Sequence, residues 1–524
     1  MDIHPELDAA RCSRTNAVKC SRHSFALIAC LALGSLARAQ TECEANGASV
    51  RHLFEQQRWE DVVRCYASSA ADSSGSASAN SDYFHGMALA RLERWEEARA
   101  AFEAGAAKAP DDSRFPLELA GIAFRFQSRA AALPHLRRAL RIEPESNYTN
   151  NFLGTLYFLD GNLDAALKYW NRAARPFVEE VSIDPRPRLD PVLLDRALAF
   201  SPASVLTLED LDTSRARLDL MGVFPASRIE LNAQEDGTFN LNLRVVERSG
   251  WGASGWSKAI GLLRGLPYQT VHGEYFNLGG DATNFRSQLR WDSDKRRAFV
   301  ELAGPLAGEP SHRYRAFFDG RDENWRVLGE SGDPAAASSF GFERQEAGFD
   351  VTSVVSGRLS WTTGLSFSHR RFQDADAGTA DPGLFSSGWL AKAHAGVEYR
   401  VLRFPERRIT VDSSATSTLG KRWTSKGLFL QPKAELRFQW FPQAESDDYE
   451  TTLRLRSGTT PPRRQEGPLD PAGLLRRPFG EQLGLLALAA RNPRRAVQWL
   501  FWHATRTMRR AADGLRGAVG ERDR

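Results

Sequence analysis

Residues 177–248 read FVEEVSIDPRPRLDPVLLDRALAFSPASVLTLEDLDTSRARLDLMGVFPASRIELNAQEDGTFNLNLRVVER, and this stretch decides the fold of the middle of the chain. Apolar residues alternate from Phe177 to Ile183, which predicts a short strand. Asp190-Pro191 and Thr207 each mark the start of a helix, and Gly222 marks the end of the second one. Alternating apolar residues on both sides of Gly237 predict a hairpin. We therefore expect the order strand, helix, helix, strand, strand. An α+β domain without a specialised role fits the same pattern.

Residues 1–39 have the pattern of a secretory signal peptide. A basic region precedes an apolar core from Ser24 to Leu36, and Ala37-Arg38-Ala39 stands before Gln40. Cys30 also fits a lipoprotein cleavage pattern, so lipidation is an alternative. No apolar run reaches the roughly eighteen residues of a membrane helix. The sequence predicts a protein that leaves the cytoplasm.

Cys43 and Cys65 are the cysteines that follow the predicted cleavage point. In an oxidising compartment such a pair favours a disulfide, and the segment between them is long enough to close the loop. Two separate buried thiols are the alternative.

Residues 40–176 contain a repeat with a period of 34 residues. Ala98, Ala132 and Ala166 keep this step, and so do Phe102, Leu136 and Trp170. A 34-residue helix–turn–helix period is typical of the tetratricopeptide repeat, so we expect an all-α solenoid here. The Ser- and Ala-rich stretch from Ser68 to Ser81 is expected to be a flexible loop that interrupts an earlier copy.

Repeats of this kind leave a concave groove, which is lined by the first helix of each pair. Aromatic and arginine side chains are frequent in the energetically important parts of protein interfaces. The period predicts a partner-binding groove that contains Tyr83, Met87, Arg91, Arg114, Phe124, Arg125, Tyr148 and Asn151. Packing against the next helix is the alternative role for each of them.

After residue 248 the apolar spacing changes to two, and nine or ten strands are expected between residues 268 and 458. One face of these strands repeats Arg, Lys and Glu, and the other often begins or ends on an aromatic residue. Glu398 and Glu435 are expected to be solvated partners of Arg400 and Arg437. This pattern favours an antiparallel outer-membrane β-barrel in residues 249–460, with a soluble sheet as the alternative.

The segments Leu218–Phe224 and Val245–Glu247 make residues 177–248 resemble a POTRA domain, the periplasmic unit attached to outer-membrane assembly barrels. The segments Phe276–Phe285 and Phe299–Pro305 resemble the first strands of a BamA/TamA-type barrel. The resemblance implies an outer-membrane protein with periplasmic N-terminal domains. It also implies a POTRA-like sheet edge that binds client strands by β-augmentation.

Residues 461–524 depart from that family. This tail is rich in Arg, lacks Lys, and shows neither alternation nor a terminal aromatic residue. The expected barrel is therefore incomplete. We interpret the tail as a truncated or frame-altered end; a sheet completed by a partner and a sheet that is not a membrane barrel are the alternatives.

No motif for catalysis, phosphate binding or metal coordination is found, so we expect no enzyme activity, no cofactor and no metal. The charge of +4 disfavours a dedicated nucleic-acid binder. The expected role is assembly, insertion or translocation of outer-membrane or secreted proteins. Its partners would be periplasmic or outer-membrane proteins and outer-membrane lipid. A polysaccharide or polymer export porin with a helical-repeat scaffold is the alternative, and a periplasmic scaffold with a soluble sheet is a third.

Overall fold

The computed structural model describes residues 49–71, 78–126, 128–248, 256, 260, 265–327, 338–373, 387–424, 427–442 and 450–458. The predicted signal peptide 1–39, Cys43 and the tail 461–524 lie outside the described residues. The chain divides into two compact units, residues 1–152 and 153–524, and the boundary falls within helix α8.

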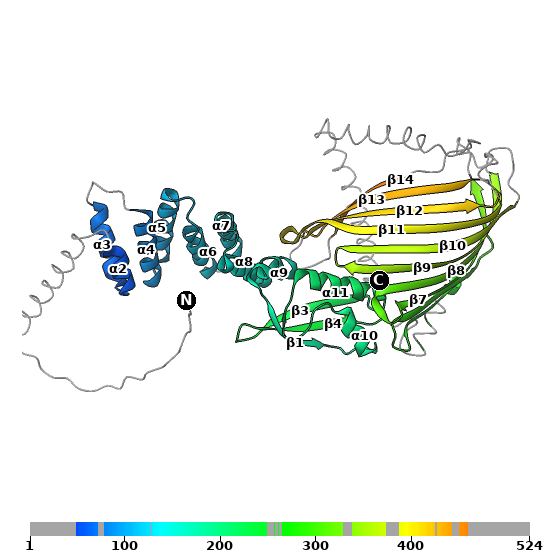
Figure 1. The fold of residues 1–524 in the computed structure, drawn as a ribbon, viewed down its shortest axis with the longest axis horizontal. Helices are drawn as coiled ribbons and strands as arrows, with labels where there is room; N and C mark the ends of the chain where they lie inside the picture. The colour runs from blue at the N-terminus through cyan, green and yellow to red at the C-terminus, as the bar shows by residue number, and fades with distance from the viewer. Residues whose placement is uncertain are drawn as a thin grey trace, which may run out of the picture. The chain divides into compact units, whose positions relative to one another are not determined.

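The first unit consists of helices that pack in antiparallel pairs (Figure 1). The helices up to the boundary are α2 (Ser49–Glu55), α3 (Trp59–Ala71), α4 (Ala79–Arg91), α5 (Trp95–Lys108), α6 (Arg114–Arg125), α7 (Arg129–Ile142) and α8 (Asn147–Leu159). The predicted loop from Ser68 to Ser81 is too long, because α3 continues to Ala71 and α4 begins at Ala79. Ser78 caps α4 by accepting a hydrogen bond from the Ser81 backbone, so serine begins a helix here.

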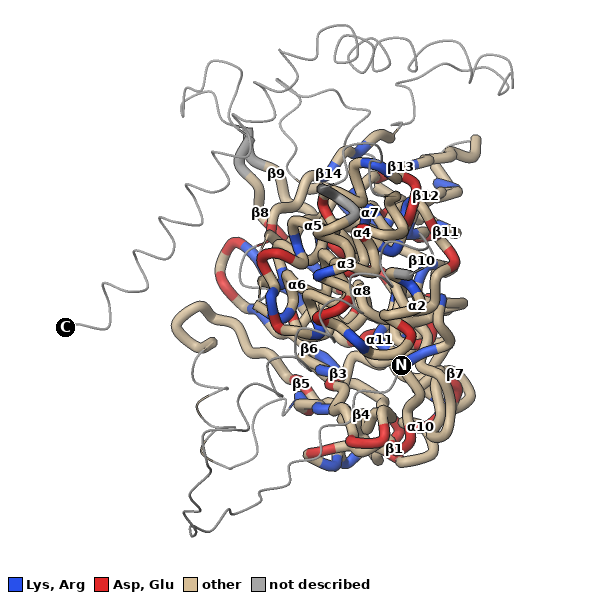
Figure 2. The backbone as a smooth tube through the Cα atoms, turned by 90° about the vertical axis from the view of Figure 1, so that its left-hand side faces the viewer, with Lys and Arg blue, Asp and Glu red and all other residues tan. Residues whose placement is uncertain are grey.

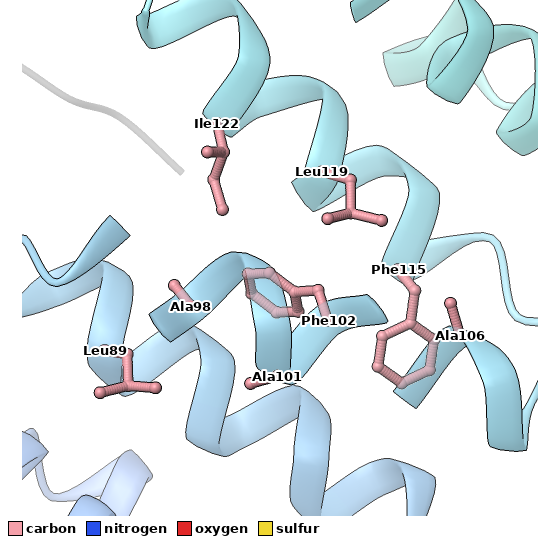
Figure 3. Packing of buried hydrophobic residues seen from close by; sticks show 8 residues of the cluster. All are labelled: Leu89, Ala98, Ala101, Phe102, Ala106, Phe115, Leu119 and Ile122. Carbon is pink, nitrogen blue, oxygen red and sulfur yellow. The ribbon is translucent and has the colours of Figure 1, made fainter. Parts of the chain in front are cut away.

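A hydrophobic cluster joins α4, α5 and α6 (Figure 3). Phe102 and Phe115 are fully buried in it. Gly86 and Gly105 face these rings closely: a Cβ atom at Gly86 would lie 2.6 Å from Phe102, and one at Gly105 would lie 2.2 Å from Phe115. The absence of a side chain therefore lets α4 approach α5 at Gly86 and lets α5 approach α6 at Gly105.

The 34-residue period also relates the side-chain sizes at two buried positions, one on each helix of a pair. Where the first helix has glycine the second has an aromatic residue, and where it has alanine the second has leucine. The three pairs are Gly86 with Phe102, Ala120 with Leu136, and Gly154 with Trp170.

The second unit begins with the end of α8, α9 (Leu163–Trp170) and a small α+β domain. The domain consists of β1 (Phe177–Ile183), α10 (Pro191–Ala197), β2 (Ser204–Val205), α11 (Leu208–Met221), β3 (Ala226–Ala233) and β4 (Phe239–Val246). Its sheet has the order β2-β1-β4-β3, in which β1 is parallel to β4 and β3 is antiparallel to β4. The predicted element order is confirmed, with the two-residue β2 added.

Local sequence signals explain the helix ends of this domain. Asp190 accepts a hydrogen bond from the Val192 backbone and begins α10, and Thr207 accepts one from the Asp210 backbone and begins α11. Gly222 ends α11 with a φ of +69°, a conformation that glycine adopts without strain. Leu211 and Leu218 on α11, together with Leu241 and Leu243 on β4, are fully buried in the core of the domain.

The rest of the second unit is a curved antiparallel sheet of ten strands within the described residues (Figure 1). The strands lie in chain order from β5 at one edge to β14 at the other. They are β5 (Thr270–Leu278), β6 (Thr283–Trp291), β7 (Lys295–Leu306), β8 (Glu309–Val327), β9 (Ser338–Ser356), β10 (Leu359–Gln373), β11 (Gly388–Phe404), β12 (Ile409–Arg422), β13 (Leu428–Trp440) and β14 (Thr451–Gly458). The predicted strand number is confirmed, but β9 has no counterpart among the expected segments. Small and polar residues such as Gln345 and Ala347 weaken its alternation.

The two faces of this sheet differ in chemistry. One face exposes large apolar side chains, among them Phe318, Phe349, Leu365, Phe367 and Trp389. The opposite face holds carboxylates that are buried by arginine and lysine partners, including Glu301, Asp319, Glu346 and Asp350. Figure 2 shows that Lys and Arg are interspersed with Asp and Glu over the backbone. Among the helices of the described segments, none is both long and apolar enough to cross a membrane.

Candidate functional sites: the repeat groove and the docking face of helix α11

Tyr83 of α4 and Arg114 of α6 lie together on the first helices of two consecutive repeats. The Arg114 guanidinium lies 4.6 Å from the Tyr83 ring centroid, and the Tyr83 hydroxyl donates to Glu118 Oε1 at 3.4 Å. Burial raises the pKa of Tyr83 to about 12, with Glu118 adding to the effect. Burial also raises the pKa of Glu118 above its ordinary value. An acidic residue that the repeat period did not reveal, Glu118, thus lies among the residues of the predicted groove.

Met87, another residue of the predicted groove, packs against the hydrophobic cluster of α4, α5 and α6. Arg114 is held in place by Asp112, whose carboxylate accepts from it at 2.7 Å. These contacts hold the Arg114 guanidinium over the Tyr83 ring.

Arg91 and Arg125 have a different position from Arg114. Each lies over the tryptophan that begins the second helix of the preceding repeat: Arg91 is 6.0 Å from the Trp59 ring and Arg125 is 4.3 Å from the Trp95 ring. Arg125 also lies 3.7 Å from Glu93. These cation–π contacts join neighbouring repeats, so the two arginines have a structural role there.

The other predicted groove residues lie at the α6–α8 step. Phe124 packs edge-on against Phe152 with ring centroids 5.5 Å apart, and Tyr148 lies 6.4 Å from the same ring. Tyr148 is 66% exposed and Asn151 is half-buried. Tyr83, Arg114 and Glu118 therefore form a polar end, and Phe124, Tyr148 and Phe152 form an aromatic end of one helical surface.

Cys65 is buried against Val62 and Leu53, and it is disulfide-bonded. Its pairing with Cys43 stays a prediction because Cys43 lies outside the described residues.

In the second unit, α9 and α11 dock on the hairpin turns at one end of the ten-stranded sheet. Helix α11 contacts β8 and β9, and α9 contacts the turn Pro405–Arg407 between β11 and β12 (Figure 1). Asn162 caps α9 with its side-chain oxygen and donates to the Pro405 carbonyl at 2.9 Å with its side-chain nitrogen. One residue therefore both begins the helix and attaches it to the turn.

A network of ion pairs fills this docking face. Asp164 of α9 accepts from Arg215 of α11 at 2.7 Å and from Arg403 of β11 at 2.6 Å. Arg403 also donates to Asp212 of α11, and Arg400 lies 3.7 Å from the same carboxylate. Burial alone would raise the pKa of Asp164, but Arg215 and Arg403 outweigh burial and hold the pKa below its ordinary value.

A second ion pair lies beside the network. Lys168 and Tyr169 of α9 donate to Glu406 Oε1 at 2.5 Å and 2.8 Å. Burial alone would raise the pKa of Glu406, but these hydrogen bonds hold it below its ordinary value. The ionised carboxylate is therefore the form that this contact requires.

Two hydrogen bonds, each between a backbone group and a side chain, also join α11 to the sheet. The Gly357 N–H, in the turn between β9 and β10, donates to Thr213 Oγ1 at 2.9 Å. A Cβ atom at Gly357 would lie 2.2 Å from Asp212 Cβ, which leaves room only for glycine. At the other end of α11, Asn284 of β6 donates to the Met221 carbonyl at 2.8 Å. The docking face thus includes three hairpins of the sheet.

None of these docking residues was a predicted site residue. Each carboxylate–arginine pair joins segments that are far apart in the chain, and such pairs leave no spacing signal. The sequence interpretation also pairs Arg400 with Glu398, whereas the structure pairs Arg400 with Asp412 at 3.2 Å and with Asp212. The expected neighbours Arg437 and Glu435 do lie 3.7 Å apart.

No protein-family model matches the chain, and no curated protein sequence matches it. Solved structures with partial similarity include CdiB from Acinetobacter baumannii, with 15% identity, a TM-score of 0.32, and coverage of 55% of this chain and 53% of that chain. BamA from Haemophilus ducreyi lacking POTRA domains 1–3 has 12% identity, a TM-score of 0.27, and coverage of 51% of this chain and 52% of that chain. This chain therefore spans about half the length of both. YrrB, a TPR protein with an unusual peptide-binding site, has 21% identity, a TM-score of 0.22, and coverage of 24% of this chain and 63% of that chain.

Proposed function

We propose that this chain is a non-catalytic outer-membrane protein that takes part in the assembly, insertion or translocation of outer-membrane or secreted proteins. The observation that carries the proposal is the docking of α9 and α11 on three hairpin turns of an amphipathic antiparallel sheet. This contact holds a small α+β domain, with an open sheet edge, at one end of strands suited to a bilayer.

The outward face of the sheet supports a membrane location. Large apolar side chains such as Phe349, Leu365 and Phe367 are each about half exposed there. A continuous apolar face of this kind would be unfavourable in water and favourable in lipid. The carboxylates of the opposite face, such as Asp319 and Glu346, are paired with arginine or lysine within the protein, and this polar face suits a polar interior.

The α+β domain offers a place where a client segment can bind. Strand β3 is an edge of its sheet, and within the described residues it pairs only with β4. Its outward N–H and C=O groups suit the addition of an extended segment as a further strand. We propose that this POTRA-like domain binds client strands at β3.

The repeats supply a second binding surface, formed by the polar end at Tyr83, Arg114 and Glu118 and the aromatic end at Phe124 and Tyr148. We propose that this surface binds a periplasmic or outer-membrane protein segment. Arg114 lies at the polar end itself, over Tyr83 and on the same helix as Glu118, whereas Arg125 lies over Trp95 between repeats. Arg114→Glu should therefore weaken partner capture, while Arg125→Glu should alter repeat stability more than capture.

Cross-linking in cells tests the β3 proposal. A photo-reactive amino acid is placed at Arg228 on the edge strand, and the matched control places it at Arg244 on β4. These two positions lie directly opposite each other, and both side chains are exposed. Unfolded outer-membrane proteins should cross-link from Arg228 and much less from Arg244.

Equal yields from both positions, or no outer-membrane protein from either, would contradict client binding at β3. Recovery of an anionic or neutral polysaccharide in place of protein would favour the polymer-export alternative. Separation of membrane fractions checks the proposed location in the same cells.

A further inference from the structure

Five arginines lie directly opposite one another on five consecutive strands of the ten-stranded sheet. The pairing is Arg290 with Arg297, Arg297 with Arg321, Arg321 with Arg344, and Arg344 with Arg370, from β6 to β10. Directly opposed residues of an antiparallel sheet point to the same face. The five side chains therefore form one band, here called the arginine band, on the polar face.

The carboxylates of this face neutralise the arginine band only in part. Asp319 contacts Arg297, Arg321 and Arg344 at 2.9, 2.7 and 3.1 Å. Asp292 contacts Arg290, Glu323 contacts Arg321 at 3.9 Å, and Glu346 is shared between Arg344 and Lys392. Among the described residues, these five arginines and Lys392 thus meet four carboxylates, which leaves two positive charges in excess.

Arg370 carries most of this excess. In the part of the chain that the structure describes, it has no carboxylate within ion-pair distance, and its Nε and that of Arg344 lack a hydrogen-bond partner. Its direct neighbour Arg344 is another cation. Like charges placed opposite each other destabilise a sheet, and among the described residues no carboxylate lies within ion-pair distance of Arg370 to offset this cost.

The arginine band lies far from the docking face of α11. Arg370 stands thirteen residues along β10 from Gly357. At about 3.3 Å per residue, that is roughly 40 Å along the strand. The ion pairs of the docking face therefore do not extend to the band.

We propose that the arginine band binds a multivalent oxyanion whose charged groups are phosphates. Neighbouring strands are about 4.8 Å apart, so one arginine side chain of the band begins at about that interval across the sheet. A phosphate has three acceptor oxygens, and the planar guanidinium fork donates two parallel hydrogen bonds to such a group. A chain of phosphates can accept from several strands at once and neutralises the two excess charges. Arg370 and Arg344 are the residues that bind it most directly.

The test uses the full chain purified in detergent, with sodium tripolyphosphate as the probe and sodium chloride at equal ionic strength as the reference. Tripolyphosphate should raise the unfolding temperature of the wild-type protein more than sodium chloride does. Arg370→Gln should raise the dissociation constant for tripolyphosphate about tenfold, the size expected for one charged hydrogen-bonding contact. Arg370→Lys keeps the positive charge but loses the planar guanidinium. Its dissociation constant for tripolyphosphate should lie between those of the wild type and Arg370→Gln.

Arg371→Gln is the matched control. It makes the same change one residue away, on the opposite face of β10, and should bind tripolyphosphate as the wild type does. Without the probe, Arg370→Gln should be at least as stable as the wild type, because it removes a repulsion with Arg344. Equal tripolyphosphate binding by Arg370→Gln and the wild type would overturn the proposal. The proposal would also be overturned if Arg371→Gln lost as much affinity for tripolyphosphate as Arg370→Gln. It would likewise be overturned if Arg370→Gln were less stable than the wild type without tripolyphosphate.

Discussion

Arg403 of β11 binds two carboxylates from different helices at once: its guanidinium donates to Asp164 of α9 at 2.6 Å and to Asp212 of α11. The side chains of Arg403 and Asp212 are only 10% and 7% exposed. Removing one partner of a buried ion pair leaves the other charge without compensation in a region of low dielectric constant. The position of the α+β domain at the strand turns therefore depends strongly on this one arginine.

Arg403→Gln should destabilise the full chain by about 3–5 kcal/mol, the usual cost of breaking a buried ion pair on one side. Asp212→Asn should also destabilise the chain. The double variant should lose clearly less unfolding free energy than the two single variants lose together. Chemical unfolding in detergent measures all three. The control is Arg407→Gln, because Arg407 is exposed in the neighbouring turn. This change should alter the free energy of unfolding very little. Additive losses would show that Arg403 and Asp212 do not act together.

Gly357→Ala should destabilise the contact between α11 and the turn of β9 and β10. The new Cβ would lie 2.2 Å from Asp212 Cβ and 2.8 Å from the Thr213 nitrogen, so backbone has to move. Overpacking of this kind typically costs about 1–3 kcal/mol. Gly121→Ala is the matched change in open space on α6, and it should leave stability unchanged or raise it slightly. An unfolding midpoint for Gly357→Ala equal to that of the wild type would show that the close approach is not required.

Acid should weaken the docking face through Glu406. Its pKa in the folded chain lies below the ordinary value of 4.5 because Lys168 and Tyr169 hydrogen-bond to the carboxylate. A carboxyl with a lowered folded pKa contributes stability that is complete above about pH 4.5 and is lost as the pH falls through the folded value. Glu406→Gln should thus be less stable at pH 7 and should lose less stability between pH 5 and 3. A stability profile parallel to that of the wild type at all pH values would refute this role.

Much of the fold follows from local pattern in the sequence. Asp190, Thr207 and Gly222 act within one or two helical turns, and they begin or end helices as predicted. The 34-residue period fixes which small residue faces which large one. Strand alternation identifies nine of the ten strands, and it fails at β9 because Gln345 and Ala347 stand where apolar residues were expected.

The candidate sites follow from the sequence less well, for a physical reason. The period places Tyr83 and Arg114 on the first helices of consecutive repeats, and in the structure these two side chains are in contact. It does not show that Arg125 stacks on Trp95, since that contact depends on the length of the turn between helices. The docking face joins Asp164 to Arg403 across 239 residues, and no local pattern encodes such a pair.

The size match between paired helices of the repeats predicts a coupling that can be measured. Ala120 and Leu136 are both fully buried and occupy the positions that Gly86 and Phe102 occupy one repeat earlier. Leu136→Phe alone should destabilise the chain by about 1–3 kcal/mol, because Ala120 retains a methyl group where the ring needs space. Ala120→Gly alone should cost about 1 kcal/mol or more through helix propensity and lost packing.

The double variant reproduces the Gly86–Phe102 combination at the middle repeat. It should be more stable than the sum of the two single changes predicts, since glycine opens the space that the phenylalanine ring fills. A coupling energy of at least about 1 kcal/mol is within the range for residues in direct contact. The matched control combines Leu136→Phe with Gly121→Ala, which lies next in the chain but has nothing within 4 Å of its added methyl group. This control pair should be additive. Equal coupling in both doubles, or none in either, would mean that the exchange of size between paired helices does not determine their packing.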